Sequence, residues 1–281
     1  MPRSKKEKIV LGITFVIFTL YAISLVYPLI WVLLNSFKSA SEFFENLWGL
    51  PSSLYLKNYS GAFSLEVNRT NLLEMFGNSL ILVVGCTAVS VIVPMLSAYV
   101  IARFNFRGRG FIYSVAIAAM LIPTVGTLSA TYKLMIDLQL YGTHLGVIIL
   151  SSGGFGFNFI MLHGFFRNIS NAYAESAKID GATDFRVFRS IMVPQVLPSV
   201  MAISIISAIN YWNDYFTPYM YLRDFPTVAV GLQYIVAKMN SQSNWPQLFA
   251  VMLISIVPVI VVFSAFQKTI MENTVAGGLK G

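Results

Sequence analysis

The feature of this sequence that most constrains its fold is a set of six long apolar runs. About 18 to 20 apolar residues in a helix, at roughly 1.5 Å per residue, cross about 30 Å of hydrocarbon. The runs lie near residues 9–34, 75–103, 110–135, 143–166, 195–220 and 246–267. Charged residues make up only 11% of the 281-residue chain, against about 25% in an average soluble domain. The sequence therefore excludes a soluble fold and predicts an all-α membrane protein, a single transmembrane domain over residues 1–281 with six transmembrane helices.

The first apolar run is predicted to be a retained helix rather than a secretory signal peptide. It extends from Ile9 to Leu34, beyond the 7–15 apolar residues typical of a signal peptide, and no small-residue cleavage pattern follows it. Prolines lie inside several of the runs, Pro28, Pro94, Pro123 and Pro258, and we expect them to kink the helices without ending them.

The positions of the basic residues predict the orientation in the membrane. Six crossings place both termini on one side, and thirteen of the nineteen Lys and Arg residues then fall on that side. Because basic residues are enriched in cytoplasmic loops, both termini are predicted to be cytoplasmic. The net charge of +7 is accordingly attributed to contact with membrane lipid and not to nucleic acid.

The sequence offers no residues for catalysis or for a metal site. Its single cysteine is Cys86 and its two histidines are His144 and His163, too few for a Cys or His metal cluster. No stretch matches the phosphate-binding pattern G-x-x-x-x-G-K-[ST]. We therefore expect no catalytic residue and no cofactor in this chain.

One acidic residue, Asp214, lies in the fifth apolar run beside amides and aromatic rings, in the stretch NYWNDYFTP. Intramembrane carboxylates usually face a cavity or a partner, and rings next to polar groups suit a sugar. The predicted substrate path comprises Asn210, Trp212, Asn213 and Asp214. Two alternatives stay open: Asp214 lies at the outer interface, or it binds a proton or cation in an ion-coupled secondary carrier. Carriers, however, usually show internal repeats and paired intramembrane charges.

The cytoplasmic stretch 168–192 is the most charged internal segment of the chain. Its sequence predicts a short helix that stops at Gly181 and a second one that begins near Thr183 or Asp184. Phe185, Phe188 and Met192 follow at helical spacing and form an apolar stripe. Such a pair of helices can lie on lipid headgroups or fit a groove in a cytoplasmic partner.

Residues 175–198, ESAKIDGATDFRVFRSIMVPQVLP, resemble the EAA motif of ABC importer permeases. The positions that match as they stand are Glu175, Ala177, Asp180, Gly181, Ala182, Phe188, Ile191, Pro194 and Pro198. Ser176 and Val193 replace a small residue and a leucine of the pattern. Further stretches resemble the carbohydrate branch, the MalG-like permeases of the maltose type, among them SAYVIARF at 97–104, LIP at 121–123 and the glycine-rich end at 277–281.

The resemblance implies a type I ABC importer permease fold and a division of labour between chains. Such permeases pair with a second homologous permease, sit on two cytoplasmic ATPase subunits that carry ATP and Mg²⁺, and receive a sugar from an extracytoplasmic solute-binding protein. The expected location is the cytoplasmic (inner) membrane of a bacterium or archaeon. A non-sugar solute is the alternative cargo, because the EAA motif does not identify the cargo.

Within this resemblance, segment 168–192 is expected to be the coupling loop that docks on the ATPase. The expected coupling residues are Glu175, Ala177, Lys178, Asp180, Gly181, Ala182, Phe185, Arg186, Phe188 and Arg189. Phe185 and Phe188 are expected to fill the groove of the ATPase, and Gly181 to set the turn. On the outer side, residues 35–76 and 223–247 are expected to face the binding protein, with Thr227, Val228 and Gly231 in the contacting loop.

Overall fold

The structure is a computed structural model that describes residues 5–121, 126–239 and 243–276, with side chains between residues 6 and 268. Part of the third apolar run, including Ile122 and Pro123, and the glycine-rich end at 277–281 lie outside the described residues. The chain divides into two compact units. Unit 1 comprises residues 1–67 and 232–257, and unit 2 comprises residues 68–231 and 258–281.

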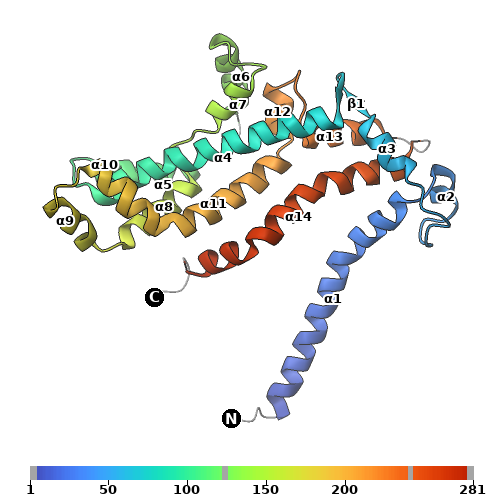
Figure 1. Cartoon of the computed structure of the whole chain (residues 1–281), viewed down its shortest axis with the longest axis horizontal. Helices are drawn as coiled ribbons and strands as arrows, with labels where there is room; N and C mark the ends of the chain where they lie inside the picture. The colour runs from blue at the N-terminus through green and yellow to red at the C-terminus, as the bar shows by residue number, and fades with distance from the viewer. Residues whose placement is uncertain (1–4, 122–125, 240–242, 277–281) are drawn as a thin grey trace. The chain divides into compact units, whose positions relative to one another are not determined.

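Helices dominate the described chain, which also contains one two-stranded sheet of β1 and β2 (Figure 1). In chain order the elements are α1 (Lys5–Ser36), α2 (Ala40–Glu45), α3 (Lys57–Phe63), β1 (Glu66–Val67), β2 (Thr70–Asn71), α4 (Leu72–Arg103), α5 (Arg109–Leu121), α6 (Leu128–Asp137), α7 (His144–Leu150), α8 (Phe157–Asn168), α9 (Asn171–Ile179), α10 (Asp184–Val187), the π-helical turn η1 (Phe188–Met192), α11 (Val193–Asn213), α12 (Phe216–Tyr221), α13 (Val228–Lys238) and α14 (Trp245–Ala276).

Four helical stretches are long and apolar enough to cross a membrane: Lys6–Ser36, Leu72–Arg103, Asp184–Asn213 and Trp245–Lys268. They overlap the first, second, fifth and sixth predicted runs, and the stretch that overlaps the fifth run begins earlier, at Asp184. The prediction of a helical, multi-pass membrane protein is thus confirmed.

The third and fourth predicted runs contain shorter helices. The run near 110–135 holds α5 and α6, and the run near 143–166 holds α7 and α8, which residues 151–156 separate. The continuous helix predicted over 143–166 is therefore interrupted. The physical reason is the sequence SSGGFG, whose three glycines disfavour a helix and whose last, Gly156, has a φ of +154°. The fifth run is also divided, since α11 ends at Asn213 and α12 begins at Phe216.

In unit 2, α4 is the central helix and packs against α8 and α11. Asn71 and Glu74 form a capping box at its first turn. Pro94 has no N–H and cannot donate to the carbonyl of Ser90 four residues earlier. The Nδ2 atom of Asn158, on α8, donates to that carbonyl at 3.0 Å and replaces the missing partner.

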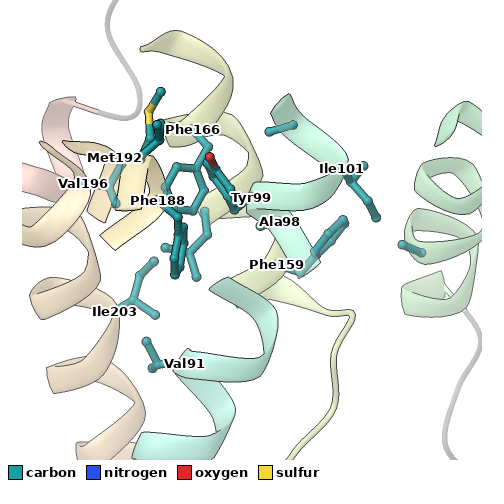
Figure 2. Close-up of a cluster of buried hydrophobic side chains, with 14 of the residues drawn as sticks. Val91, Ala98, Tyr99, Ile101, Phe159, Phe166, Phe188, Met192, Val196 and Ile203 are labelled. Atoms are coloured by element: carbon teal, nitrogen blue, oxygen red, sulfur yellow. The ribbon is translucent and has the colours of Figure 1, made fainter. Parts of the chain in front are cut away.

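The largest buried cluster of unit 2 joins the C-terminal ends of α4 and α8 to η1 and α11. Figure 2 shows Tyr99, Phe166 and Phe188 converging at its centre. The ring centroid of Tyr99 lies 4.7 Å from that of Phe188 and 5.3 Å from that of Phe166. Three elements that are distant in sequence are therefore held by one aromatic cluster.

In unit 1, a buried polar group holds the chain where α1 ends. The Nδ2 atom of Asn58, on α3, donates to the carbonyls of Ser36 at 2.8 Å and Lys38 at 2.7 Å. The buried Lys38 ammonium donates to the carbonyl of Asn46 at 2.6 Å. Desolvation by burial lowers the pKa of Lys38, and the charge of Glu42 opposes this.

Asn58 is expected to be needed for the stability of the segment that follows α1. Asn58→Leu keeps a similar volume but leaves two carbonyls without partners, each at a cost of about 1–3 kcal/mol. We expect limited proteolysis of the purified protein to cleave residues 37–63 faster in this variant. Ser60→Ala, which changes an exposed side chain of the same helix, serves as the control and should be cleaved like the wild type. Equal cleavage rates of Asn58→Leu and the control would contradict this role.

Candidate functional site

The candidate site is the charged segment 168–192, in which α9 and α10 form the predicted helix pair (Figure 1). The backbone N–H of Ala182 donates to the carbonyl of Ala177 at 2.9 Å, and that of Gly181 to the carbonyl of Lys178 at 3.0 Å. This pattern is a Schellman motif, which requires a left-handed residue, and Gly181 has a φ of +80°. Thr183 then caps α10, since its Oγ1 accepts from the N–H of Arg186 at 3.3 Å. The predicted turn at Gly181 is confirmed.

An ion pair crosses this turn. The Nζ atom of Lys178 lies 2.7 Å from Oδ1 of Asp184, and both side chains are more than half exposed. The hydrogen bond that Lys178 donates to Asp184 and the negative charge of Asp184 raise the pKa of Lys178. Because exposed ion pairs contribute at most about 1 kcal/mol, the pair adds little to the stability of the turn.

The predicted apolar stripe is divided between the surface and the interior. Phe185 is 68% exposed, whereas Phe188 is 8% exposed and packs on Tyr99 inside unit 2. Ala177 is also buried, and Ala182 is half-buried. The expectation that Phe188 fills a groove in a partner is therefore wrong. Its spacing from Phe185 predicted a shared face, but Phe188 begins the π-helical turn η1 and points into the core with Met192.

One exposed apolar residue of the segment was missed from the sequence. Ile179, in the last turn of α9, is 86% exposed. The available signal was a large aliphatic residue directly before the predicted helix stop. Ile179 and Phe185, which we call the apolar tip, are accompanied by exposed charged side chains, namely Glu175, Lys178, Asp180, Arg186 and Arg189. The segment thus presents apolar anchors within a charged rim, a pattern found at protein interfaces.

The four residues of the predicted substrate path lie close in sequence but have different surroundings. Asn210 and Asn213 are exposed, and Asn213 Nδ2 donates to the carbonyl of Ile209 at 2.8 Å. Asp214 lies between α11 and α12, where its Oδ1 accepts from the N–H of Thr217 at 3.1 Å. Trp212 is buried, with its ring centroid 5.6 Å from that of Phe76, and lines an apolar cavity with Leu80, Val83 and Pro258. Trp212 is therefore not grouped with the polar side chains.

The residues predicted to contact the binding protein are buried within unit 2. Val228 donates its N–H to Ser79 Oγ at 2.9 Å, and Thr227 Oγ1 accepts from the N–H of Val230 at 3.3 Å. Gly231 lies so close to α4 that a Cβ atom there would be 2.4 Å from the Sδ atom of Met75. Thr227, Val228 and Gly231, which were expected in the loop that contacts the binding protein, are thus buried in this chain and attach the start of α13 to α4.

Among the described residues, no group of three or more His, Cys, Asp or Glu side chains could hold a metal ion.

Comparisons with known proteins identify the family. The family described as "Binding-protein-dependent transport system inner membrane component" matches residues 90–273. The diacetylchitobiose uptake system permease protein NgcG of Streptomyces coelicolor is 29% identical, over 95% of this chain and 88% of that protein. The polygalacturonan/rhamnogalacturonan transport system permease protein YtcP of Bacillus subtilis is 30% identical, over 93% and 95%. The probable ABC transporter permease protein YurM of the same organism is 29% identical, over 93% and 86%.

The fold has a close counterpart among solved structures. A chain of a bacterial ABC transporter involved in the import of the acidic polysaccharide alginate superposes with a TM-score of 0.82 at 24% identity, over 95% of this chain and 99% of that chain. The resemblance to ABC importer permeases that residues 175–198 predicted is confirmed. The chain belongs to the family of inner membrane components of binding-protein-dependent transport systems, permease subunits rather than enzymes, and has the type I importer permease fold.

Proposed function

We propose that this chain is the membrane-spanning permease subunit of an ATP-driven importer of a sugar or oligosaccharide. Relatives that match more than 90% of the chain are named for the uptake of diacetylchitobiose, arabinooligosaccharides, polygalacturonan and rhamnogalacturonan, and starch degradation products. Their shared cargo is carbohydrate, which supports the sugar over a non-sugar solute.

The observation that carries the coupling role is the apolar tip of segment 168–192. A side chain such as Ile179 at 86% exposure is unfavourable in water and gains free energy when a partner covers it. We infer that the partner is a cytoplasmic ATPase, which carries the ATP and Mg²⁺. Ile179 and Phe185 enter its groove, while Glu175, Lys178, Asp180, Arg186 and Arg189 form the rim. Ala177, Ala182 and Phe188 hold the segment in shape from within, and Gly181 forms the turn between α9 and α10.

The remaining subunits and the orientation follow from the same proposal. The chain pairs with a second homologous permease in the bacterial or archaeal cytoplasmic membrane. Two ATPase subunits bind the pair on the cytoplasmic side, and a solute-binding protein binds it on the opposite side. Both termini are cytoplasmic, as the distribution of Lys and Arg favours. The pairs α5–α6 and α7–α8 supply the third and fourth of six crossings, near residues 110–135 and 143–166. The break at 151–156 is compatible with a crossing, because non-helical backbone is tolerated at membrane depth where it lines a cavity or is buried in protein.

The polar residues at the end of α11 form the substrate path. Asn210 and Asn213 are exposed, and Asp214 retains one carboxylate oxygen beyond its bond to Thr217. Amide and carboxylate groups of this kind bond the hydroxyls of a sugar. Trp212 holds this end of α11 by packing beneath it.

Purification from the native membrane in mild detergent, followed by mass spectrometry, tests the proposed assembly. We expect a second permease with an EAA motif and an ATPase with a phosphate-binding loop to copurify with the tagged chain. A chain that copurifies with neither, and that alone moves solute along an ion gradient, would establish the secondary carrier in place of the importer. The solute-binding protein of the assembly can then be titrated with sugars and with non-sugar solutes to determine the cargo.

A further inference from the structure

The last turn of α4 is hydrogen-bonded to the corner between α8 and α9, at Ile169 and Ser170. Nη1 of Arg103 donates to the carbonyl of Ile169 at 2.8 Å, and its Nη2 donates to the carbonyl of Ser170 at 3.2 Å. More than sixty residues separate Arg103 from these acceptors. The guanidinium therefore connects a membrane-spanning helix directly to the entry of segment 168–192.

The two acceptors explain why an arginine suits this position. Ile169 is the C-cap of α8, where the last carbonyls of a helix lack intrahelical partners, and Ser170, the next residue, is the N-cap of α9. The C-terminal end of a helix also favours a positive charge. A planar guanidinium can donate to two neighbouring oxygens at once, whereas a lysine ammonium offers a single point of attachment.

The same turn of α4 also holds the exit of the segment. Tyr99, one turn before Arg103, packs its ring against Phe188 of η1. Nη2 of Arg103 lies 3.8 Å from Sδ of Met192, which is fully buried. Tyr99 and Arg103 together therefore contact both the entry and the exit of the segment, and the exposed apolar tip lies between these two contacts in the chain.

We propose that Arg103 is a positioning residue that couples segment 168–192 to α4. When the ATPase displaces the apolar tip, the corner at Ile169 and Ser170 moves with it. The two hydrogen bonds of Arg103 transmit this displacement to α4, so that the segment and the helix move together. Without these two hydrogen bonds, the corner can move while α4 stays in place, and ATP is hydrolysed without a corresponding movement of the membrane helices. This inference rests on the proposed function, since it assumes that an ATPase binds the apolar tip and displaces it.

The test compares Arg103→Gln, Arg103→Lys and the control Arg107→Gln in the complete transporter, reconstituted in liposomes with its ATPase and binding protein. Arg107 is exposed and lies in the connection between α4 and α5, four residues after Arg103. The measured quantity is the amount of sugar taken up per ATP hydrolysed. We expect Arg103→Gln to lower this ratio about tenfold, because an uncharged amide cannot reproduce the two hydrogen bonds of the charged guanidinium. Arg103→Lys should give an intermediate ratio, and Arg107→Gln the wild-type ratio.

A purely structural role would lower the amount of assembled transporter but leave the ratio unchanged. A wild-type ratio in assembled Arg103→Gln would overturn the inference. Where Arg103→Gln fails to assemble, Arg103→Lys decides, and a wild-type ratio there overturns the inference equally. The wild-type transporter tests the proposed function separately, because a complete absence of ATP-driven uptake by the wild type would refute that function itself.

Discussion

Replacing Ile179 and Phe185 together by aspartate is expected to reduce ATP-driven uptake about a hundredfold. Both side chains are mostly exposed in the isolated chain, so the substitution should leave the fold of the permease intact. Truncation or polar replacement of apolar anchors at an interface commonly costs about 2 kcal/mol or more per residue, and two such losses suffice to detach the ATPase. The measurement is the amount of ATPase that copurifies with the tagged variant, together with uptake in reconstituted liposomes.

Two further variants make this result specific to the apolar tip. Phe106→Asp changes an exposed apolar residue of the α4–α5 connection and should leave both ATPase binding and uptake unchanged. Phe188→Asp places a charge in the aromatic cluster with Tyr99 and Phe166, and should instead lower the yield of folded permease. Normal ATPase binding by the Ile179 and Phe185 double variant would show that the tip does not dock on the ATPase.

The second large effect is expected at Gly231. A Cβ atom at this position would overlap the Sδ atom of Met75, and Gly231→Val adds two further methyl groups. Overpacking of this kind typically costs about 1–3 kcal/mol and would displace the start of α13 from α4. We expect a decrease in uptake of about tenfold or more, with lower thermal stability of the purified permease.

A rescue variant distinguishes this packing effect from loss of a partner contact. Met75→Ala removes the side chain that the valine would strike, so the double variant Met75→Ala, Gly231→Val should recover part of the lost stability and uptake. Gly77→Val, on the same stretch of α4, adds a side chain where no atom lies within 4 Å and serves as the control. Equal defects in Gly231→Val with and without Met75→Ala would contradict the packing explanation.

The sequence predicts local features of this chain well because their causes are local. The first, second and sixth apolar runs form the long helices expected of them, and the glycine at position 181 ends α9 by a motif that depends on neighbouring backbone groups. The EAA pattern likewise fixes the family through residues that are contiguous in the chain.

What the sequence does not predict depends on contacts between distant segments. Phe188 is buried because its ring packs against that of Tyr99, about ninety residues earlier, and helical spacing alone cannot indicate this contact. Gly231 is close to Met75 rather than to solvent for the same reason. The interruption at 151–156 lies in an apolar run, where hydropathy outweighed the helix-breaking effect of three glycines in our prediction.

The most direct test of the central claim is sugar uptake into liposomes that contain the permease pair and the binding protein, measured with and without the ATPase subunits. The account predicts that uptake requires both the ATPase and hydrolysable ATP, and that the Ile179 and Phe185 double aspartate variant reduces it about a hundredfold. Uptake of equal rate in liposomes that lack the ATPase, driven by an ion gradient, would contradict the account.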